Sequence, residues 1–70
     1  MEKFIIGENI RRLRKEKNIT QEKICQEANI SQPYLSRVER DLFTPSIKLL
    51  YRISKVLNVT IDELIVVKDE

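Results

Sequence analysis

Four Ser or Thr residues divide this chain into short helical segments. Thr20, Ser31, Ser46 and Thr60 each stand directly before a stretch whose apolar residues recur at helical spacing. A hydroxyl at that position accepts a hydrogen bond from a backbone N–H of the first turn, so each of these residues is a typical helix N-cap. The chain is therefore expected to fold into helices of a few turns separated by short connections.

Five helices are expected in all, since Ile6, Ile10 and Leu13 mark one more before Thr20. Asn, which tolerates the left-handed conformation, stands where the first, second and fourth helices should end. The predicted ranges are 6 or 7 to 17, 21 to 28, 32 to about 41, 47 to 57 and 61 to about 65. Connections of two to five residues indicate a compact five-helix bundle, an all-α fold with a single domain over residues 1–70.

The residue types that are missing restrict the chemistry. The chain has no His and only one Cys, so it lacks the commonest general base and can form neither an internal disulfide nor a Cys-based metal site. We expect no enzymatic activity, no metal and no cofactor. Cys25 shares an apolar stripe with Ile24 and Ala28, which indicates a small core residue rather than a redox sensor.

No stretch of about 18 apolar residues is present that would span a membrane. The first six residues are too short and too charged for a signal peptide. A cytoplasmic protein without a membrane partner is therefore expected.

Basic charge is concentrated in the middle of the chain. Residues 11–57 hold eleven Lys or Arg against five Asp or Glu, whereas residues 1–10 and 58–70 are net acidic. The middle is a candidate surface for a polyanion such as nucleic acid. A solvated helix surface is the alternative explanation of the same charges.

The segment from Thr20 to Asp41 predicts two short helices joined by a tight turn. The second of these helices has an inward apolar stripe that includes Leu35, Val38 and Leu42. Its opposite face is polar and basic, and carries Gln32, Pro33, Ser36, Arg37 and Arg40. Such a face suits a DNA major groove, where Gln pairs with adenine and Arg with guanine. A merely solvated helix surface would show the same pattern.

The start of the second predicted helix is a candidate phosphate site. Its first backbone N–H groups lie beside Gln21, and a helix N-terminus favours an anion. Lys23 and Arg12 are expected to add positive charge there.

Five short sequence motifs follow one another along the chain. They are Ile-Gly-Glu-Asn-Ile-Arg-Arg-Leu-Arg-Lys-Glu-Lys, Ile-Thr-Gln-Glu, Tyr-Leu-Ser-Arg-Val-Glu-Arg, Thr-Pro-Ser and Val-Thr-Ile-Asp-Glu-Leu. At these spacings they resemble the phage lambda Cro and repressor family, the Xre-type helix-turn-helix DNA-binding domains. The resemblance runs from Ile6 to Leu64.

The resemblance implies that the third helix enters the major groove while the second lies across the DNA backbone. The positions that match the usual base-reading sites of the family are Gln32, Pro33, Ser36 and Arg37.

Other positions match the family's contacts with the DNA backbone. Gln21 matches a phosphate-contacting Gln, and Arg40 and Thr44 fall where backbone contacts are common. Tyr34, at the edge of the outward face, either packs over a phosphate or shields the core.

The resemblance also implies an ion pair between Arg14 and Glu39 that links the first helix to the third. Glu39 lies near the inward stripe, where a partly buried carboxylate needs a partner. Two positions depart from the family, which often has Gly where this chain has Asn29 and Asp41. An acidic residue near the DNA face, such as Asp41, is also an electrostatic cost.

A homodimer is expected, because one reading helix spans only a few base pairs and a two-fold dimer reaches successive major grooves about 34 Å apart. Residues 61–70 are the predicted dimer segment. The candidate interface residues are Phe43, Ile61, Leu64, Ile65, Val66 and Val67. Residues 65–67 alternatively form a strand that pairs across the dimer, or the same residues complete the monomer core. Phe4 and Tyr51 are interpreted as core or interface residues.

The expected function is a sequence-specific double-stranded DNA-binding transcriptional regulator. It would act as a repressor or an activator, including a phage regulator or the controller of a restriction-modification system. The alternatives are an antitoxin-like partner and an adaptor that uses the same fold only for protein interaction. The unbroken polar and basic face of the third helix favours DNA over the adaptor.

Overall fold

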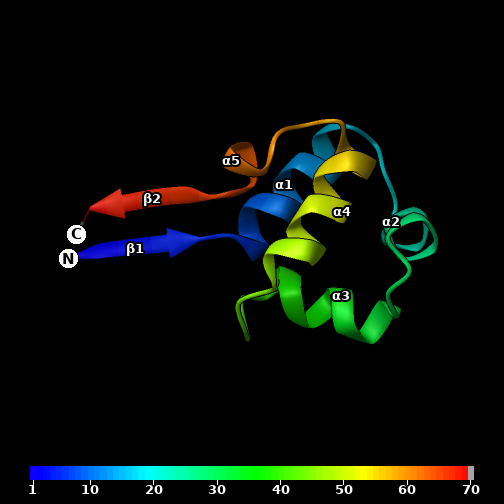
Figure 1. Ribbon diagram of the computed structural model, residues 1–70, viewed down its shortest axis with the longest axis horizontal. Coiled ribbons are helices and arrows are strands. Elements are labelled where there is room, and N and C mark those ends of the chain that lie inside the picture. The colour runs from blue at the N-terminus through cyan, green and yellow to red at the C-terminus, as the bar shows by residue number, and fades with distance from the viewer. Residues whose placement is uncertain (70) are drawn as a thin grey trace.

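The computed structural model describes residues 1–69 and has five helices and two short strands, shown in Figure 1. The elements are β1 (Glu2–Ile5), α1 (Gly7–Glu16), α2 (Gln21–Ala28), α3 (Gln32–Glu39), α4 (Ile47–Leu57), α5 (Ile61–Leu64) and β2 (Val66–Asp69). The five predicted helices are confirmed, and most of their ends lie within one residue of the expected positions. The third helix ends two residues before its predicted end at Asp41.

All four predicted N-caps accept a backbone hydrogen bond from the third residue after them. The donor–acceptor distances are 3.1 Å at Thr20, 3.2 Å at Ser31, 3.2 Å at Ser46 and 3.3 Å at Thr60. The bond at Thr60 is donated by Glu63 and is the N-cap half of a capping box, in which a Thr hydroxyl and a Glu carboxylate each accept a backbone N–H of the first turn. Each cap satisfies an N–H that has no partner within its own helix.

A left-handed residue follows each of the first four helices. Asn18, Asn29, Asp41 and Asn58 have φ between 56° and 58°. After α3, the Leu42 N–H bonds to the Arg37 carbonyl at 3.1 Å and the Asp41 N–H to the Val38 carbonyl at 3.0 Å. This pair of bonds is a Schellman motif, a turn that closes a helix and that Gly usually occupies. The left-handed turn at Asp41 is the reason that α3 stops early.

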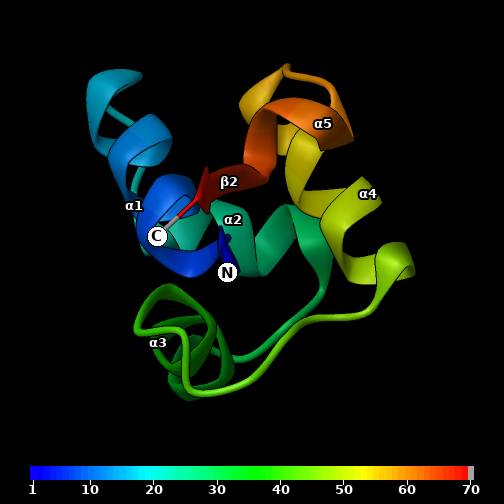
Figure 2. The same ribbon diagram turned by 90° about the vertical axis from the view of Figure 1, so that its left-hand side faces the viewer.

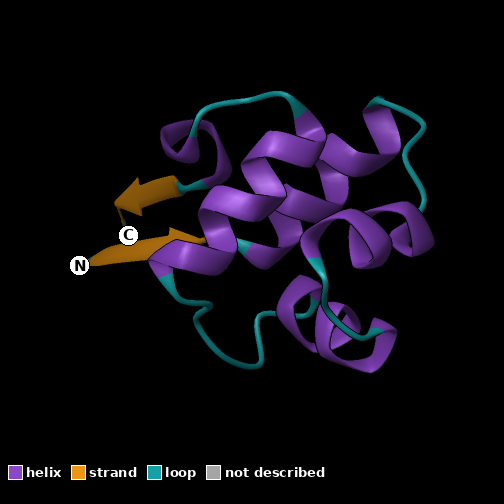
Figure 3. Ribbon diagram, turned by 45° about the vertical axis from the view of Figure 1, so that its right-hand side comes forward, coloured by secondary structure: helices purple, strands orange, loops and turns teal. Residues whose placement is uncertain are grey.

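The helices enclose one apolar core. Helix α2 packs against α4 and α1 against α3, while α5 closes one end beside α4 (Figures 1 and 3). The fully buried side chains of this core include Ile10, Ile24, Leu35, Val38, Ile53, Leu57 and Leu64. Leu64 therefore belongs to the core of the monomer, as one alternative predicted, and not to the dimer interface that was the other alternative for it.

Strands β1 and β2 form an antiparallel two-stranded sheet that the sequence analysis missed. Glu2 pairs with Asp69, Phe4 with Val67 and Ile5 with Val66. The two strands project from the helical body as an arm, which carries both chain ends (Figure 1). Residues 66 and 67 are thus in a strand, as one alternative predicted, but its partner is the strand at the other end of the same chain.

Helices α1 and α3 meet closely at Gly7. A side-chain carbon added there would lie 1.8 Å from the backbone oxygen of Val38, so only Gly allows the approach. The Asp41 carboxylate lies on the same side and accepts hydrogen bonds from the N–H groups of Gly7, at 2.8 Å, and Glu8, at 3.1 Å. The start of α1 is thereby fixed to the end of α3.

Within residues 1–69, no helix is both long enough and apolar enough to cross a membrane.

Candidate nucleic-acid interface

Helix α3 lies at the edge of the molecule with its polar face outward, and Figure 2 shows it below the other helices. Its inward residues Leu35 and Val38 are fully buried. On the other side Gln32, Pro33, Arg37 and Arg40 are exposed and Ser36 is half-buried. The four predicted base-reading residues therefore occupy one accessible surface.

The Glu39 carboxylate anchors α3 from the inside. It is only 3% exposed and forms two bonds with the Arg14 guanidinium, from Nε at 2.8 Å and from a terminal nitrogen at 3.2 Å. Arg14 also donates to the Ile19 carbonyl at 3.1 Å, between α1 and α2. A buried carboxylate that is paired in this way fixes the orientation of two helices, since breaking the pair would leave a buried charge without its counter-ion.

Gln21 connects this buried pair to the outward face. Its side-chain nitrogen donates to Glu39 at 3.0 Å, and its side-chain oxygen accepts from the Gln32 amide at 3.3 Å. The amide of Gln21 is therefore oriented by a carboxylate, and it in turn orients Gln32. A chain of hydrogen bonds runs from α1 through α3 and α2 to the first residue of the predicted reading helix.

A hollow of about 600 Å³ lies between α1, α2 and α3 on this face. Its lining residues are Arg11, Arg14, Lys15, Gln21, Ser36, Glu39 and Arg40. Within residues 1–69, Arg11, Lys15 and Arg40 form no ion pair, whereas the charge of Arg14 is balanced by Glu39. Three uncompensated cations therefore surround a hollow next to Ser36, an arrangement that attracts an anion.

Arg12 is not among these cations, contrary to the sequence prediction. Its guanidinium bonds to the Asn9 side-chain oxygen at 2.6 Å and to Glu16 at 2.7 Å, and Asn9 in turn donates to the Glu63 carbonyl at 2.7 Å. Arg12 therefore faces α5 and the arm. Arg11 and Lys15 were not among the phosphate contacts expected from the sequence. Their spacing of four on one helix, with Arg14 three residues after Arg11, was the available signal.

Two further predicted phosphate contacts lie apart from the hollow. Lys23 is exposed on α2 and lies 3.8 Å from the Glu27 carboxylate. Thr44 is exposed in the loop after α3 and borders the arm.

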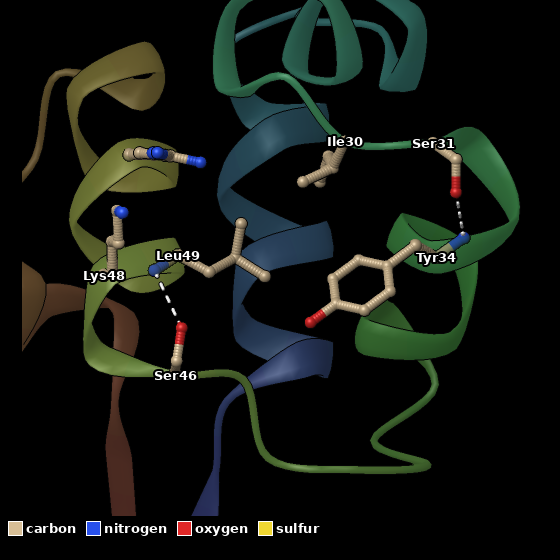
Figure 4. A pocket seen from close by; sticks show the side chains of 7 residues that line it. Ile30, Ser31, Tyr34, Ser46, Lys48 and Leu49 are labelled. Atoms are coloured by element: carbon tan, nitrogen blue, oxygen red, sulfur yellow. Dashed lines mark hydrogen bonds between the residues drawn. The ribbon is translucent and has the colours of Figure 1, made fainter.

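The Tyr34 ring packs against Phe43, with 5.0 Å between ring centroids. The ring also lines a second pocket of about 350 Å³ between α3 and α4, shown in Figure 4. Lys48 and Arg52 stand on the α4 side of that pocket. Tyr34 thus packs against the core, and Lys48 and Arg52 are two further basic residues near the start of α3.

A sequence profile of the helix-turn-helix family matches residues 10–64, which is most of the chain. The chain belongs to the lambda repressor-like, Xre-type helix-turn-helix family. In this helix-turn-helix protein α2 and α3 are the two helices of the motif, and the turn between them contains Asn29.

Relatives of this helix-turn-helix protein are transcriptional regulators. It is 39% identical over 66 residues to the uncharacterized HTH-type transcriptional regulator y4dJ of Sinorhizobium fredii, covering 94% of this chain and 86% of that protein. It is 40% identical over 67 residues to SinR of Bacillus licheniformis, with 94% of this chain and 60% of SinR covered. The chain thus spans less than two thirds of SinR. Like these relatives, it is a DNA-binding transcriptional regulator.

Solved structures agree with this family. SinR in complex with DNA superimposes with a TM-score of 0.79 at 38% identity, covering 86% of this chain and 97% of that one. The P22 c2 repressor in complex with a synthetic operator gives 0.75 at 33% identity, covering 83% and 88%. The restriction-modification controller C.AhdI of Aeromonas hydrophila gives 0.78 at 26% identity, also covering 83% and 88%.

The two departures from the family have different consequences in this helix-turn-helix protein. Asn29 adopts the left-handed conformation that Gly would otherwise supply, with φ of 58°. Asp41 does so as well, and its carboxylate is bound to the start of α1. Its charge is therefore partly taken up by two N–H groups, which reduces the cost that it was expected to impose near DNA.

The predicted dimer residues fall into three groups. Leu64 is in the core, whereas Ile61, Ile65, Val66 and Phe43 are half-buried, and Val67 is 54% exposed on the arm. The last residue of the predicted dimer segment, Glu70, lies outside the described residues.

Proposed function

We propose that this protein binds a palindromic operator as a homodimer, with α3 of each copy in the major groove, and that it regulates transcription rather than catalysing a reaction. Gln32, Pro33, Ser36 and Arg37 contact base edges. It acts in the cytoplasm, on double-stranded DNA.

The observation that carries the proposal is the hydrogen-bond chain from Arg14 and Glu39 through Gln21 to Gln32. A side chain that reads bases must be held in one orientation before it meets DNA, because ordering it on binding would cost conformational entropy. Gln32 is oriented by Gln21 at 3.3 Å, and Gln21 by a buried carboxylate at 3.0 Å. A helix surface with no ligand would not need this support.

The cations around the hollow supply the sequence-independent part of binding. Arg11, Lys15 and Arg40 lie beside Ser36 and Gln21 on the same face as the base-reading residues. Contacts from these cations to phosphates fix the position of α3 along the groove, and the bases then determine which sequence is bound. Lys48 and Arg52 extend this positive surface past the start of α3.

Selection of bound duplexes from a random pool tests the proposal. The enriched sequence should be a palindrome, and its affinity is then measured for wild type and for Arg37→Ala over a series of salt concentrations. We expect Arg37→Ala to lose about 1–3 kcal/mol and to relax one base position in each half-site.

Lys55→Ala is the matched control, because Lys55 is an exposed cation on α4 that lies over the Tyr51 ring and lines neither of the two pockets beside α3. It should leave the base preference unchanged. Failure to enrich any sequence, or weak salt-sensitive binding that ignores Arg37, would contradict the proposal. That result would instead point to a protein partner, as in the antitoxin-like or adaptor alternatives.

A further inference from the structure

The pocket between α3 and α4 combines apolar side chains with two cations. Its volume is about 350 Å³, and Ile30, the Tyr34 ring and Leu49 form an apolar floor. Figure 4 shows these three side chains pointing toward the same space from both sides of the pocket. Sites for small molecules begin at about 300 Å³ and pair an apolar lining with a few polar groups. The pocket therefore has the size and the lining of a site for a small organic molecule.

The charge of the pocket selects an anion. Lys48 and Arg52 line it from α4, and neither forms an ion pair in the described part of the chain. None of the described residues that line the pocket is acidic. A guanidinium binds a carboxylate through two parallel hydrogen bonds, and an ammonium adds a point charge. The polar end of a ligand that fits this pocket is therefore a carboxylate.

Two hydroxyls at the pocket are available as donors. The Ser31 oxygen accepts the Tyr34 N–H at 3.2 Å, and the Ser46 oxygen accepts the Leu49 N–H at 3.2 Å (Figure 4). Both bonds use a lone pair of the oxygen, so each hydroxyl keeps its own hydrogen. A carboxylate in the pocket can thus accept hydrogen bonds as well as bind the two cations.

The hollow between α1, α2 and α3 has a different lining, which separates the two sites by ligand. Every residue that lines that hollow is polar or charged. Such a lining suits a phosphate of the DNA backbone, which has no apolar part. A phosphate in the pocket between α3 and α4 would leave the apolar floor in contact with water, whereas an organic acid would cover it.

We propose that the pocket between α3 and α4 binds a small carboxylic acid with an apolar body, and that this ligand opposes DNA binding. The carboxylate binds Lys48 and Arg52, and the apolar body covers Ile30, Tyr34 and Leu49. The effect on DNA rests on the proposed function, while binding of the acid does not.

The position of the pocket determines the direction of the effect. Ser31 and Tyr34 stand at the start of α3, on either side of Gln32 and Pro33 in the chain. A bound carboxylate cancels one of the two positive charges of the pocket and places a negative charge near the DNA phosphates that α3 approaches. By linkage, the acid and the DNA each lower the affinity for the other by the same factor.

A titration of the isotope-labelled protein without DNA tests the pocket. The probes are acetate, butanoate and hexanoate at one fixed ionic strength, followed by the backbone amide resonances. The affinity should rise by about fourfold with each added CH₂ group that covers the floor. The largest changes should lie at Ile30, Tyr34 and Leu49. Hexanamide, which has the same body without the charge, should bind about tenfold more weakly than hexanoate.

Charge variants identify the residues that hold the acid. Arg52→Gln and Lys48→Gln each change an exposed side chain, so the fold should persist, and each should raise the hexanoate dissociation constant by about fivefold or more. Lys55→Gln is the matched control, because Lys55 is an exposed cation of the same helix that does not line the pocket. An affinity that does not rise from acetate to hexanoate would overturn the inference. So would an equal loss of affinity in Lys55→Gln and Arg52→Gln.

A second titration separates this inference from the proposed function. Fluorescence anisotropy measures the affinity for the selected duplex in hexanoate and in acetate at the same concentration. Hexanoate should weaken binding of wild type by about threefold or more, and the difference between the two salts should disappear in Arg52→Gln. Equal affinities of wild type in the two salts would overturn the opposition to DNA. If no duplex is selected, the proposed function fails, and the resonance changes without DNA still decide whether the pocket binds the acid.

Discussion

The carboxylate of Asp41 accepts a hydrogen bond from the backbone N–H of Gly7 at 2.8 Å, although 34 residues separate the two in the chain. Residue Ile6 supplies no side-chain cap to α1, so the cap comes from the residue that ends α3. Asp41 thus has two roles, as the left-handed residue after one helix and as the capping residue of another.

Asp41→Gly should separate these roles. Gly adopts the left-handed conformation more readily than Asp, but it has no side chain to cap α1. Loss of a cap lowers the free energy of unfolding by about 1 kcal/mol. Asn58→Gly is the control, because Asn58 is left-handed to the same degree and ends α4 without capping another helix. It should change the unfolding free energy by no more than about 0.5 kcal/mol. Urea unfolding measures the free energy of unfolding of both variants. An equal loss in Asp41→Gly and Asn58→Gly would refute the capping role of Asp41.

Gly7→Ala should destabilise the protein despite the better helix propensity of Ala. Propensity favours Ala by about 1 kcal/mol, but the new methyl group would meet the Val38 carbonyl, so α1 and α3 must move apart. We expect a net loss of about 1–3 kcal/mol. Glu8→Ala, at the exposed next position, controls for propensity. A thermal midpoint for Gly7→Ala at or above that of wild type would contradict the close approach.

Arg14→Ala should reduce stability and DNA binding together. It leaves the Glu39 carboxylate buried without its partner, which typically costs about 3–5 kcal/mol. Lys23→Ala removes an exposed pair at 3.8 Å and should cost less than about 1 kcal/mol. Lost binding with unchanged melting would instead make Arg14 a direct phosphate contact.

Replacing both Arg14 and Glu39 separates the contribution of this pair to stability from its role in orienting Gln21. The double variant Arg14→Met with Glu39→Met leaves no buried charge, so much of the lost stability should return. DNA affinity should stay low, because Gln21 no longer has the carboxylate that orients it. Recovery of full affinity in this variant would show that the hydrogen-bond chain is dispensable for binding.

Salt dependence should identify the cations that contact phosphates. Arg11→Gln and Lys15→Gln should each lower the slope of log affinity against log salt by about 1, the value for one lost phosphate contact. Arg12→Gln should change it less, since Arg12 is paired with Glu16 at 2.7 Å and faces α5. An equal change in slope for all three variants would contradict the arrangement around the hollow.

The Cys25 thiol should react slowly in the folded protein. Burial raises its pKa above 9.0, and the Glu39 carboxylate raises it further. The folded state therefore holds the thiol proton more tightly than the unfolded state. The Cys25 thiol therefore makes its full contribution to the free energy of unfolding at pH values below the pKa of the unfolded thiol. This contribution decreases as the pH rises through the pKa of the folded thiol. At mildly alkaline pH, a thiol reagent should modify Cys25 more slowly in the folded protein than in the protein unfolded in urea. Equal rates of modification would contradict the raised pKa.

The helices could be predicted from the sequence because their signals are local. An N-cap such as Ser31 acts on Tyr34, three residues away, and Asn58 ends α4 where it stands. The reading face of α3 follows from helical periodicity in the same way. The Arg14–Glu39 pair was available only through resemblance to a family.

The features that the sequence analysis missed depend on residues far apart in the chain. Strand β1 is four residues long and pairs with a strand more than 60 positions later, so the sequence allowed a strand at residues 65–67 but did not indicate its partner. The capping role of Asp41 is non-local in the same way. Arg12 and Arg11 are neighbours in sequence but point in directions about 100° apart on the helix, which decides which of them borders the hollow.

The antiparallel arm also determines how the fold responds to force. Both chain ends leave the arm at its tip, where Glu2 pairs with Asp69, while Ile5 pairs with Val66 next to the helical body (Figure 1). Tension between the ends would therefore load one pair of residues at a time, from the tip inward. The strands would separate at low force, and the helical core would carry load only after the last pair had opened.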